Sequence, residues 1–318
     1  MATGTGNLAT LAKAAFTDEA AAVDLMIQLR WPNGVACPRC GGCDPYRINR
    51  KGYDGHPPRR GLFKCRACRK QFTVTTGSVF EGTHVSMSKW LMAIHLMSAS
   101  KKGMSALQLQ RMLGITYRAA WFINHRLRYA METRADLFAK LSGTVEADET
   151  YIGGRVKFQH RSKKNPANKV AVVALVERKG RAIAFPVAKV DTRTLQEAVR
   201  QHVHLNAAMM TDEHHGYGAL HMGFAAHETV MHSTGEYVRG HAHTNTVEGF
   251  FSLLKRGIHG SFHHVSKGHL HRYVNEFAFR WSTRKALGYD DSQRAALLIL
   301  GAEGKRLTYQ KRGVAGAA

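Results

Sequence analysis

The stretch TVEADETYIGG at residues 144–154 opens the series of strands that decides the fold of the second half of the chain. Its first nine residues are rich in β-forming side chains and predict a strand. Two more β-rich runs follow at residues 170–177 and 181–190, and the turn RKG at residues 178–180 joins them as a hairpin. This region therefore begins as a β-sheet.

Helices and strands alternate through the rest of the chain. The predicted elements are a helix at residues 192–202, strands at 207–211 and 228–232, and helices at 244–258, 267–284 and 291–300. This alternation predicts an α/β fold in which helices flank a mixed sheet.

Basic residues outnumber acidic ones two to one. The 318 residues include 46 Lys or Arg and 23 Asp or Glu, a formal net charge of +23 with histidine neutral. Such an excess favours a nucleic acid as partner, because each neutralised phosphate releases condensed counterions. An over-basic but otherwise ordinary surface is the first alternative. A polybasic protein at a membrane surface is the second, although no basic amphipathic helix or lipidation signal accompanies the charge.

The apolar residues occur in short runs. Hydrophobic residues make up 44% of the chain, enough for a core, and the length suits about two domains. The longest apolar runs, such as residues 171–176, are strand-sized, far below the ~20 residues that span a bilayer. The first residues lack the apolar run of a signal peptide. We expect no membrane association and a cytoplasmic protein.

Four cysteines form two knuckles of the C-x-x-C type. Cys37 and Cys40 make the first, Cys65 and Cys68 the second, and 24 residues separate them. Two such knuckles supply four thiolates for a tetrahedral zinc ion and leave no open position for a catalytic water. We therefore expect one structural zinc in a small ribbon, with disulfides as the less favoured alternative. Cys43 is interpreted as a bystander; the alternative is that it replaces one of the four ligands.

Cations surround the two knuckles. The ribbon residues expected to contact DNA are Arg39, Arg59, Arg60, Lys64, Arg66, Arg69 and Lys70. A run of charge is often only a solvated surface, but a zinc ribbon this rich in cations favours nucleic-acid contact.

Helices are predicted on both sides of the ribbon. Their ranges are residues 18–29, 88–100, 105–112 and 117–130, with Thr17 and Thr116 as the caps of the first and the last.

The last two of these helices have the spacing of a helix-turn-helix, with Gly114 in the turn. In that motif Tyr117, Arg118, His125 and Arg126 would be exposed toward a groove of DNA. A plain helical hairpin is the alternative.

Three acidic residues occupy informative places on the predicted elements. Asp148 lies in the first strand, Asp212 ends a short apolar strand, and Glu248 lies on the helix that begins near residue 244. The carboxyl end of a strand faces the crevice that α/β sheets use for ligands. Converging carboxylates would hold two Mg²⁺ ions, roughly 3.5–4 Å apart, for phosphodiester cleavage. The alternative is three ordinary surface acids.

The helix that carries Glu248 has a polar stripe separate from its apolar one. Asn245, Glu248, Ser252 and Lys255 recur at spacings of three, four and three residues. Lys255 is placed to reach a phosphate as a point charge, and Arg256 beside it is a further expected DNA contact. Should the register differ by one or two residues, the alternative metal ligands are Glu146, Glu149 and Glu213.

Fourteen of the nineteen histidines lie between residues 202 and 271. A second metal site is one interpretation, with His214 and His215, or His241 and His243, as ligands. We prefer surface or phosphate-contacting roles for most of them. Only His232 and His243 are expected near the acids.

These residues resemble a known family, the bacterial insertion-sequence transposases of the ISXO-like group, which join an N-terminal zinc ribbon to an RNase H-like DDE domain. Residues 30–40, 145–154 and 243–266 carry the resemblance, and residues 76–81 and 89–90 agree with it. The resemblance extends over most of residues 17–285.

The resemblance implies roles for individual residues. Asp148 and Asp212 would be the two aspartates of the triad, Glu248 the third acid and Lys255 the accompanying base. The 35 residues between Asp212 and Glu248 agree with the family's habitual gap. Some related enzymes have Asn or His at the third place, which makes Asn245 the substitute candidate.

The implied activity is that of a DNA transposase, a metal-dependent endonuclease and strand transferase with two Mg²⁺ or Mn²⁺ ions per active site. It would free a 3′ hydroxyl at the element end and join it to target DNA, with no covalent protein intermediate. The implied partners are terminal inverted repeats, target DNA and further copies of the chain in a synaptic complex at the bacterial nucleoid.

The expected segments are an N-terminal helix at residues 1–30, the zinc ribbon at 31–80, a helix-turn-helix-like linker at 81–140, the RNase H-like DDE domain at 141–290, and a C-terminal helix and flexible tail at 291–318. Two other functions stay open. One is a DNA-binding regulator with a catalytically inactive RNase H-like domain, and the other is a stand-alone RNase H or junction nuclease.

Overall fold

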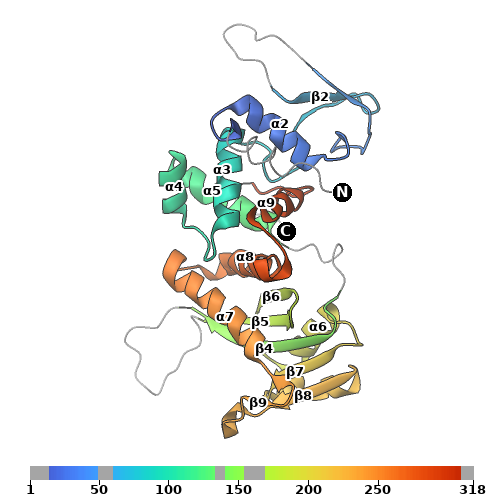
Figure 1. Cartoon of the computed structure of the whole chain (residues 1–318), viewed down its shortest axis with the longest axis vertical. Coiled ribbons are helices and arrows are strands. Elements are labelled where there is room, and N and C mark those ends of the chain that lie inside the picture. Colours follow the sequence, from blue (N-terminus) through green and yellow to red (C-terminus); the bar gives the residue numbers. More distant parts are fainter. Residues whose placement is uncertain (1–13, 49–59, 133–139, 154–168, 309–318) are drawn as a thin grey trace, which may run out of the picture. The chain divides into compact units, whose positions relative to one another are not determined.

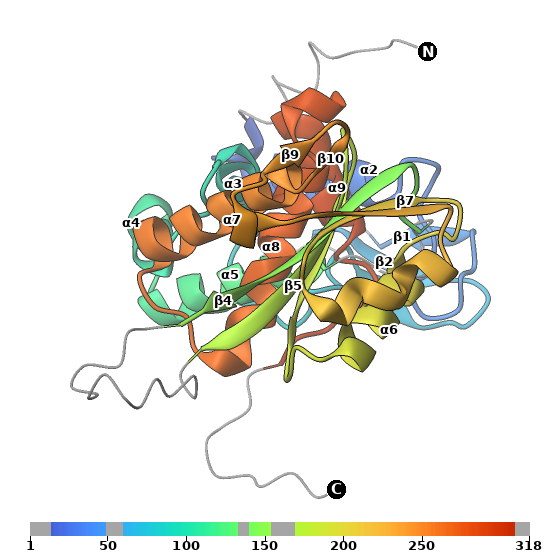
Figure 2. The same cartoon turned by 90° about the horizontal axis from the view of Figure 1, so that it is seen from below.

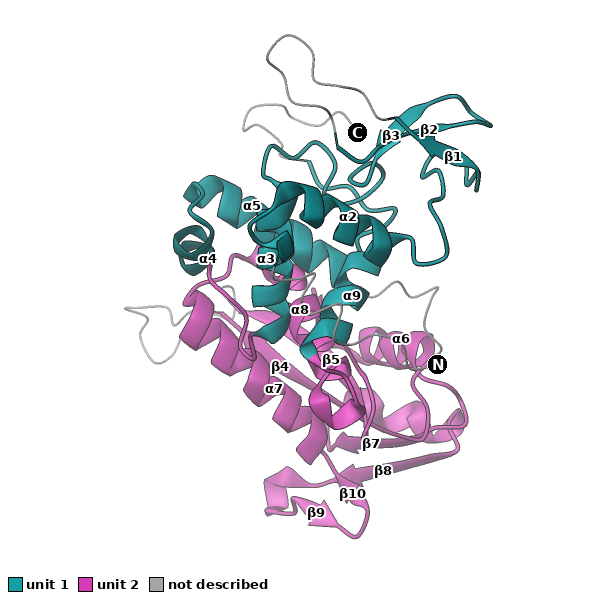
Figure 3. Cartoon of the chain, turned by 45° about the horizontal axis from the view of Figure 1, so that its top comes forward, with its two compact units in different colours: residues 1–99, 106–131, 291–318 teal, residues 100–105, 132–290 magenta. Residues whose placement is uncertain are grey.

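The computed structural model describes residues 14–48, 60–132, 140–153 and 169–308, and the chain divides into two compact units (Figures 1 and 3). The first unit comprises residues 1–99, 106–131 and 291–318, and the second comprises residues 100–105 and 132–290. Within the described ranges, no helix combines the length and the apolar character needed to cross a bilayer.

A small antiparallel sheet forms the ribbon of the first unit. Its strands are β1 (Pro45–Arg47), β2 (Leu62–Cys65) and β3 (Gln71–Thr73), in the order β1-β2-β3. The rings of Trp31, Phe63 and Phe72 pack together with centroid distances between 5.6 and 6.2 Å. A core this small needs further stabilisation, and the cysteine cluster described below can provide it by binding a metal ion.

Five helices are described in the first unit: α2 (Glu19–Arg30), α3 (Met87–Ala99), α4 (Ala106–Leu113), α5 (Tyr117–Ala130) and α9 (Asp291–Leu300). Thr116 caps α5 as predicted, and its hydroxyl accepts a hydrogen bond from the Ala119 N–H. The predicted cap of α2 is wrong by one residue. Asp18 caps the helix, because the Thr17 hydroxyl donates instead to the Ala14 carbonyl in the preceding turn.

The second unit is built on a five-stranded mixed sheet, which confirms the expected fold class (Figure 2). Its strands are β4 (Thr144–Ile152), β5 (Val170–Glu177), β6 (Ala182–Val187), β7 (Ala208–Asp212) and β8 (Ala226–Val230), in the order β6-β5-β4-β7-β8. β4 lies in the centre, antiparallel to β5 and parallel to β7.

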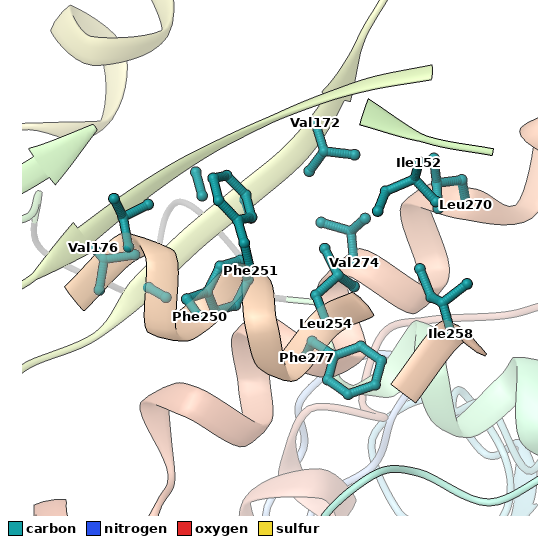
Figure 4. Packing of buried hydrophobic residues seen from close by; sticks show 14 residues of the cluster. Ile152, Val172, Val176, Phe250, Phe251, Leu254, Ile258, Leu270, Val274 and Phe277 are labelled. Carbon is teal, nitrogen blue, oxygen red and sulfur yellow. The ribbon is translucent and has the colours of Figure 1, made fainter. Parts of the chain in front are cut away.

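Helices cover both faces of this sheet. Val172, Ala174 and Val176 of β5 pack against residues of α7 (Asn245–Gly257) and α8 (Leu270–Ser282), as Figure 4 shows for part of the cluster. Val173 and Leu175 point to the other face, onto α6 (Thr192–His202) and the 3₁₀ helix η3 (His215–Met222). Alternate residues of a strand face opposite sides, so one apolar run supplies both cores.

Several shorter elements differ from the prediction. β6 ends at Val187 and β8 begins at Ala226, each two or three residues from the expected bounds. The two-residue strands β9 (Val238–Arg239) and β10 (Ala242–His243) were not predicted, because two residues carry no periodicity. The remaining short helical turns are η4 (His232–Thr234), η5 (Ile258–Phe262), η6 (Lys267–His269) and η7 (Lys285–Leu287).

Candidate functional site

Asp148 and Asp212 lie at the same level of two neighbouring parallel strands. β4 and β7 pair through Ala147 and Thr211, and the two aspartates are the next residues along each strand. Ala147 is buried in the cluster on the α6 face of the sheet, so Asp148 points to the opposite face, which α7 covers. By the same alternation, Asp212 lies on that face too, since Met209 belongs to the α6 side.

The neighbouring acids and burial raise the pKa of Asp148 to about 7. Burial has the largest effect, the charge of Asp212 follows, and Glu149 and Glu248 add smaller contributions. The N–H of Glu149 donates to Asp148 Oδ1 at 2.7 Å and partly opposes the shift. Acids that repel one another in this way stabilise a bound cation, so the donor set fits a divalent metal.

Glu248, in the first turn of α7, is the third of these acids. We call Asp148, Asp212 and Glu248 together the acidic set. Glu248 Oε1 accepts a hydrogen bond from the Thr244 hydroxyl at 3.1 Å. His232 Nε2 lies 3.8 Å from the same oxygen and 3.2 Å from Thr244 Oγ1. The carboxylate is half exposed, and Thr244 and His232 orient it.

Glu146 ties the start of α7 to the central strand. Its side chain is fully buried and accepts hydrogen bonds from the N–H groups of Thr246 and Val247, at 2.6 and 2.9 Å. The Thr246 hydroxyl donates to it at 2.7 Å and Arg178 Nε at 2.6 Å. A carboxylate that accepts the first N–H groups of a helix caps it and interacts favourably with its dipole.

This cap connects two elements of the acidic set. Glu146 and Asp148 are two residues apart on the same face of β4, while Glu248 follows Thr246 by two residues on α7. The side chain of Thr244, the residue before the helix, makes no capping hydrogen bond to the α7 backbone. Glu146 therefore holds the turn that carries Glu248 against the strand that carries Asp148.

The other two acids near the site also have partners. Tyr217 donates its hydroxyl to Glu149 Oε2 at 3.1 Å, and burial together with the Asp212 charge raises the pKa of Glu149. Burial, followed by the charge of Glu149, raises the pKa of Tyr217 well above its usual value. Glu213 accepts the Ser233 N–H at 3.0 Å.

The carboxylates are near one another without touching. Among the described residues, only Cys37, Cys40, Cys65 and Cys68 form a group of three or more metal donors whose ligand atoms all lie within 4.8 Å of one another. Two ions that are roughly 3.5–4 Å apart divide their ligands between them, so a two-metal site does not require such close spacing of its acids.

The two stripes predicted on α7 are confirmed. Val247, Phe250, Phe251 and Leu254 are buried. The polar residues Asn245, Glu248, Ser252, Lys255 and Arg256 are all exposed. A side of α7 that begins at the acidic set therefore stays open to solvent and carries two cations.

The four cysteine sulfurs are arranged as a tetrahedral zinc ion needs them. Cys37 Sγ lies 3.7 Å from Cys68 Sγ, and Cys40 Sγ lies 3.6 Å from Cys65 Sγ. Four sulfurs at ~2.3 Å from a zinc ion would be roughly 3.8 Å apart, so the residues fit the metal. Cys43 is exposed, lies outside this group, and its Sγ contacts the Gly41 carbonyl.

Most of the cations expected to contact DNA are accessible. Lys64 is partly buried, and the exposed ones in the ribbon are Arg39, Arg60, Arg66, Arg69 and Lys70. Arg59 lies outside the described residues. Arg60 and Arg66 each face an exposed aspartate, at 3.9 and 3.2 Å.

The expected exposure of the predicted recognition helix is wrong for two of its four residues. Tyr117 and Arg118 are exposed, but His125 and Arg126 are buried, with 1% and 5% exposure. The helices α3, α4 and α9 all contact α5, so more of its surface is covered than a two-helix motif alone predicts.

The histidine-rich region shows no second metal cluster in the part of the chain that the structure describes. His214 and His215 stack on each other, with ring centroids 4.7 Å apart. His243 Nδ1 lies 3.3 Å from Glu146 Oε1, and His232 lies beside Glu248. Both of these histidines lie near acids, but so does His214, whose Nε2 lies 3.9 Å from Glu149 Oε1.

The sequence contains a partial signal for the contacts of Glu146 and none for that of Thr244; neither set of contacts was predicted. Glu146 and Asp148 alternate on one strand, which places both on one face, but the partners of Glu146 lie a hundred residues later. Thr244 carries no local signal for its contact with Glu248, because that contact depends on how the loop before α7 turns.

The fold and the two sites together define a class of protein: a four-cysteine ribbon joined to an RNase H-like α/β domain with an acidic set at its central strands. Residues 140–282 match the family of the ISXO2-like transposase domain, and residues 17–71 match that of the transposase zinc-ribbon domain. A protein of transposable element ISH50 from Halobacterium salinarum is 26% identical over 285 residues, which cover 83% of this chain and 91% of that protein.

The chain thus combines two domains that are characteristic of insertion-sequence transposases. The two domains support a transposase role and imply an interaction with DNA, and the ribbon match together with the cysteine cluster supports a structural zinc.

Proposed function

We propose that this protein cleaves the ends of an insertion sequence and joins the freed 3′ hydroxyl to target DNA. The observation that carries the proposal is the placement of Asp148 and Asp212 side by side on parallel strands, with Glu248 in electrostatic reach. In the first step a water oxygen attacks the phosphorus at the element end and the 3′ oxygen leaves. In the second, that 3′ oxygen attacks a target phosphodiester in line and displaces the target's own 3′ oxygen.

Asp148, Asp212 and Glu248 are the residues that would hold two divalent ions, Mg²⁺ or Mn²⁺. Bound there, the ions would lower the pKa of the attacking water and stabilise the charge on the leaving oxygen. Glu248 is favoured over Asn245 as the third ligand, because its charge acts on Asp148 and Thr244 orients it.

Glu146 acts in this proposal as a positioning residue and not as a ligand. Its oxygens accept hydrogen bonds from α7 and Arg178, so it holds the Glu248 turn in place. Lys255 and Arg256 lie on the open side of α7 and bind neighbouring phosphates as cations. The exposed ribbon cations bind the DNA backbone away from the chemistry.

Joining an element requires its two ends to be held together, so the active form is proposed to be a homo-oligomer. It would act on chromosomal DNA in the cytoplasm, at the nucleoid.

A strand-transfer assay tests the proposal. Purified protein is incubated with Mg²⁺, DNA that carries the element's ends and a target plasmid, and nicked and joined products are separated on denaturing gels. We expect activity in the wild type and none in Asp148→Asn, with equal DNA affinity in both. Glu197→Gln is a matched control, because Glu197 is an exposed acid on α6.

Two outcomes would contradict the proposal. A wild type that binds DNA but neither nicks nor joins it would favour a DNA-binding regulator. Cleavage of RNA–DNA hybrids or four-way junctions without joining would favour a stand-alone nuclease.

A further inference from the structure

A cavity of about 280 Å³ lies in the first unit, whereas the acidic set belongs to the second unit. The loop at residues 82–85, Trp90 and the first half of α5 line it, and we call it the α5 pocket. Three features of its walls together specify a ligand.

The first feature is a buried guanidinium whose Nε has no hydrogen-bond partner. Arg126 lines the α5 pocket, is only 5% exposed, and lies over the ring of Phe122 at 4.4 Å. Its Nε is buried, and in the described part of the chain no hydrogen bond or ion pair reaches it. Burial lowers the pKa of Arg126, the charge of Arg306 lowers it further, and the charge of Glu81 opposes them more weakly.

Two other buried guanidinium groups in the described part of the chain are paired with an acid. Arg30 is 3.4 Å from Glu303, and Arg280 is 2.6 Å from Glu276. A buried charge normally needs such a partner, because its desolvation costs several kcal/mol. Arg126 makes no such ion pair with a described residue, and the charge of Glu81 acts on it only from farther away, so its environment has a place for an anion from outside the chain.

The second feature is the N-terminus of a fourteen-residue helix. Thr116, Arg118 and Ala119 from the start of α5 line the α5 pocket, and the first turn of α5 contains no acidic residue. The free N–H groups and the dipole of a helix N-terminus favour a phosphate. Two cationic side chains and the positive end of a helix therefore meet at one cavity.

The third feature is an apolar wall. Val85, Trp90, Phe122 and Ile123 form much of the lining, and a phosphate ion alone would leave this surface unused. A nucleotide has both parts that the α5 pocket offers to bind, a phosphate and a flat base that stacks on an aromatic ring.

We propose that the α5 pocket takes up one nucleotide of a DNA strand, with its phosphate at Arg126 and the start of α5 and its base against Phe122. The inference rests on the proposed function, because it requires DNA to be the partner of this chain. It gives the buried Arg126 a direct DNA contact that differs from the groove contact of an exposed recognition helix.

Binding of a fluorescent element-end duplex to the full-length, zinc-loaded protein tests the inference by anisotropy. We expect Arg126→Gln to weaken binding about tenfold or more and to reduce the salt slope by about one, because one phosphate contact is lost. Arg111→Gln is the matched control: Arg111 is an exposed cation on α4, and its loss should weaken binding much less.

Thermal unfolding without DNA separates a ligand role from a structural one. Removing an uncompensated charge should leave the Tm of Arg126→Gln equal to that of the wild type or higher. A lower Tm together with unchanged DNA affinity would overturn the inference, because Arg126 would then only support the fold.

An abasic site moved along the duplex tests for the base. In the wild type one position should weaken binding when its base is missing, and Phe122→Leu should lose that dependence. A uniform response along the strand would reject base uptake. In a parallel experiment, dAMP is added to the wild type and to Arg126→Gln without DNA. If dAMP raises the Tm of the wild type only, and Arg126→Gln binds DNA as tightly as the wild type, the ligand of the α5 pocket is a free nucleotide and the inference fails.

Nicking measured in the same samples separates this inference from the proposed function. A wild type that does not nick, yet binds DNA in an Arg126-dependent way, would reject the proposed chemistry and support the α5 pocket. Normal nicking together with a DNA affinity that does not depend on Arg126 would reject the inference about the α5 pocket and leave the proposed function intact.

Discussion

The ribbon and the acidic set are both suited to metal ions, but the chain assembles them in different ways. The four thiols come from two tight local turns, and their sulfurs lie within 4.8 Å of one another. The three carboxylates come from β4, β7 and α7, and only sheet register and the Glu146 cap bring them near each other. A closed set of thiolates suits a metal that maintains structure, and a looser acidic set with solvent access suits ions that must also bind substrate.

Of the changes considered in these two regions, loss of zinc should lower the stability of its region most. Cys65→Ser removes one of the four sulfurs, and zinc binding to such sites contributes about 10–16 kcal/mol to folding. We expect metal analysis to find one zinc per wild-type chain and less than one in the variant, and proteolysis to cut the variant within the ribbon. Cys43→Ser is the matched control and should retain its zinc, because Cys43 lies outside the cluster. Full zinc occupancy in Cys65→Ser would contradict the ligand set.

Asp148→Asn should affect activity and stability in opposite directions. Activity should fall by at least about 10³-fold, because a carboxylate that is proposed to hold the ions is lost. In the metal-free wild type the pKa of Asp148 is raised from 3.8 to about 7, so its ionisation destabilises the fold. That cost is complete above pH 7 and fades as the pH falls from 7 toward 4.

In zinc-loaded protein without added Mg²⁺ or Mn²⁺ at pH 8, therefore, Asp148→Asn should be more stable than the wild type. The gain is on the order of 2 kcal/mol after allowance for solvent screening, or about 5 °C in Tm. The difference should be smaller at pH 5. Scanning calorimetry at both pH values checks it, and an equal Tm at pH 8 would show that burial and the neighbouring acids do not raise the pKa of Asp148.

Glu146→Gln tests whether the contacts of Glu146 with α7 and Arg178 are needed to position the acidic set. The amide keeps the shape but lacks the charge that pairs with Arg178 and caps α7, so we expect a loss of roughly 3 kcal/mol in unfolding free energy. Activity should fall about 10–100-fold, as for residues that orient metal ligands. The Mg²⁺ concentration needed for half-maximal nicking should rise. Glu197→Gln is the control and should change little, because Glu197 is an exposed acid on α6.

Substitution of single ribbon cations should have the smallest effect. DNA affinity of the wild type should fall roughly 10³-fold or more between 50 and 200 mM salt, and Arg39→Gln should reduce the salt slope by about one. Arg193→Gln, an exposed cation on α6, should leave the slope unchanged. Equal slopes in all three proteins would show that the ribbon does not contact the DNA backbone.

Local signals predicted much of this fold. β4, β5, α6 and α9 have the predicted bounds, because apolar periodicity and turn residues lie within each element. The cysteine knuckles and the two stripes of α7 were predicted for the same reason, because the residues of each lie close together in the sequence.

The features that were not predicted depend on contacts between residues that are far apart in the chain. The burial of His125 and Arg126 results from the packing of α3, α4 and α9 around α5. The role of Glu146 depends on Thr246 and Val247, and Glu149 faces Tyr217 on the other side of the sheet from Asp148. Composition and periodicity contain no information on such pairs.

The first unit is completed by the last described part of the chain. Glu303 pairs with Arg30, the Gly304 N–H donates to the Gly77 carbonyl, and Lys305 Nζ donates to the Tyr129 carbonyl at 2.9 Å. During translation, these contacts can form only after residue 305 has left the ribosome. A nascent chain whose ribbon has already left the ribosome still lacks α9. The unit that carries the ribbon can therefore complete its packing only after the whole five-stranded sheet has been synthesised.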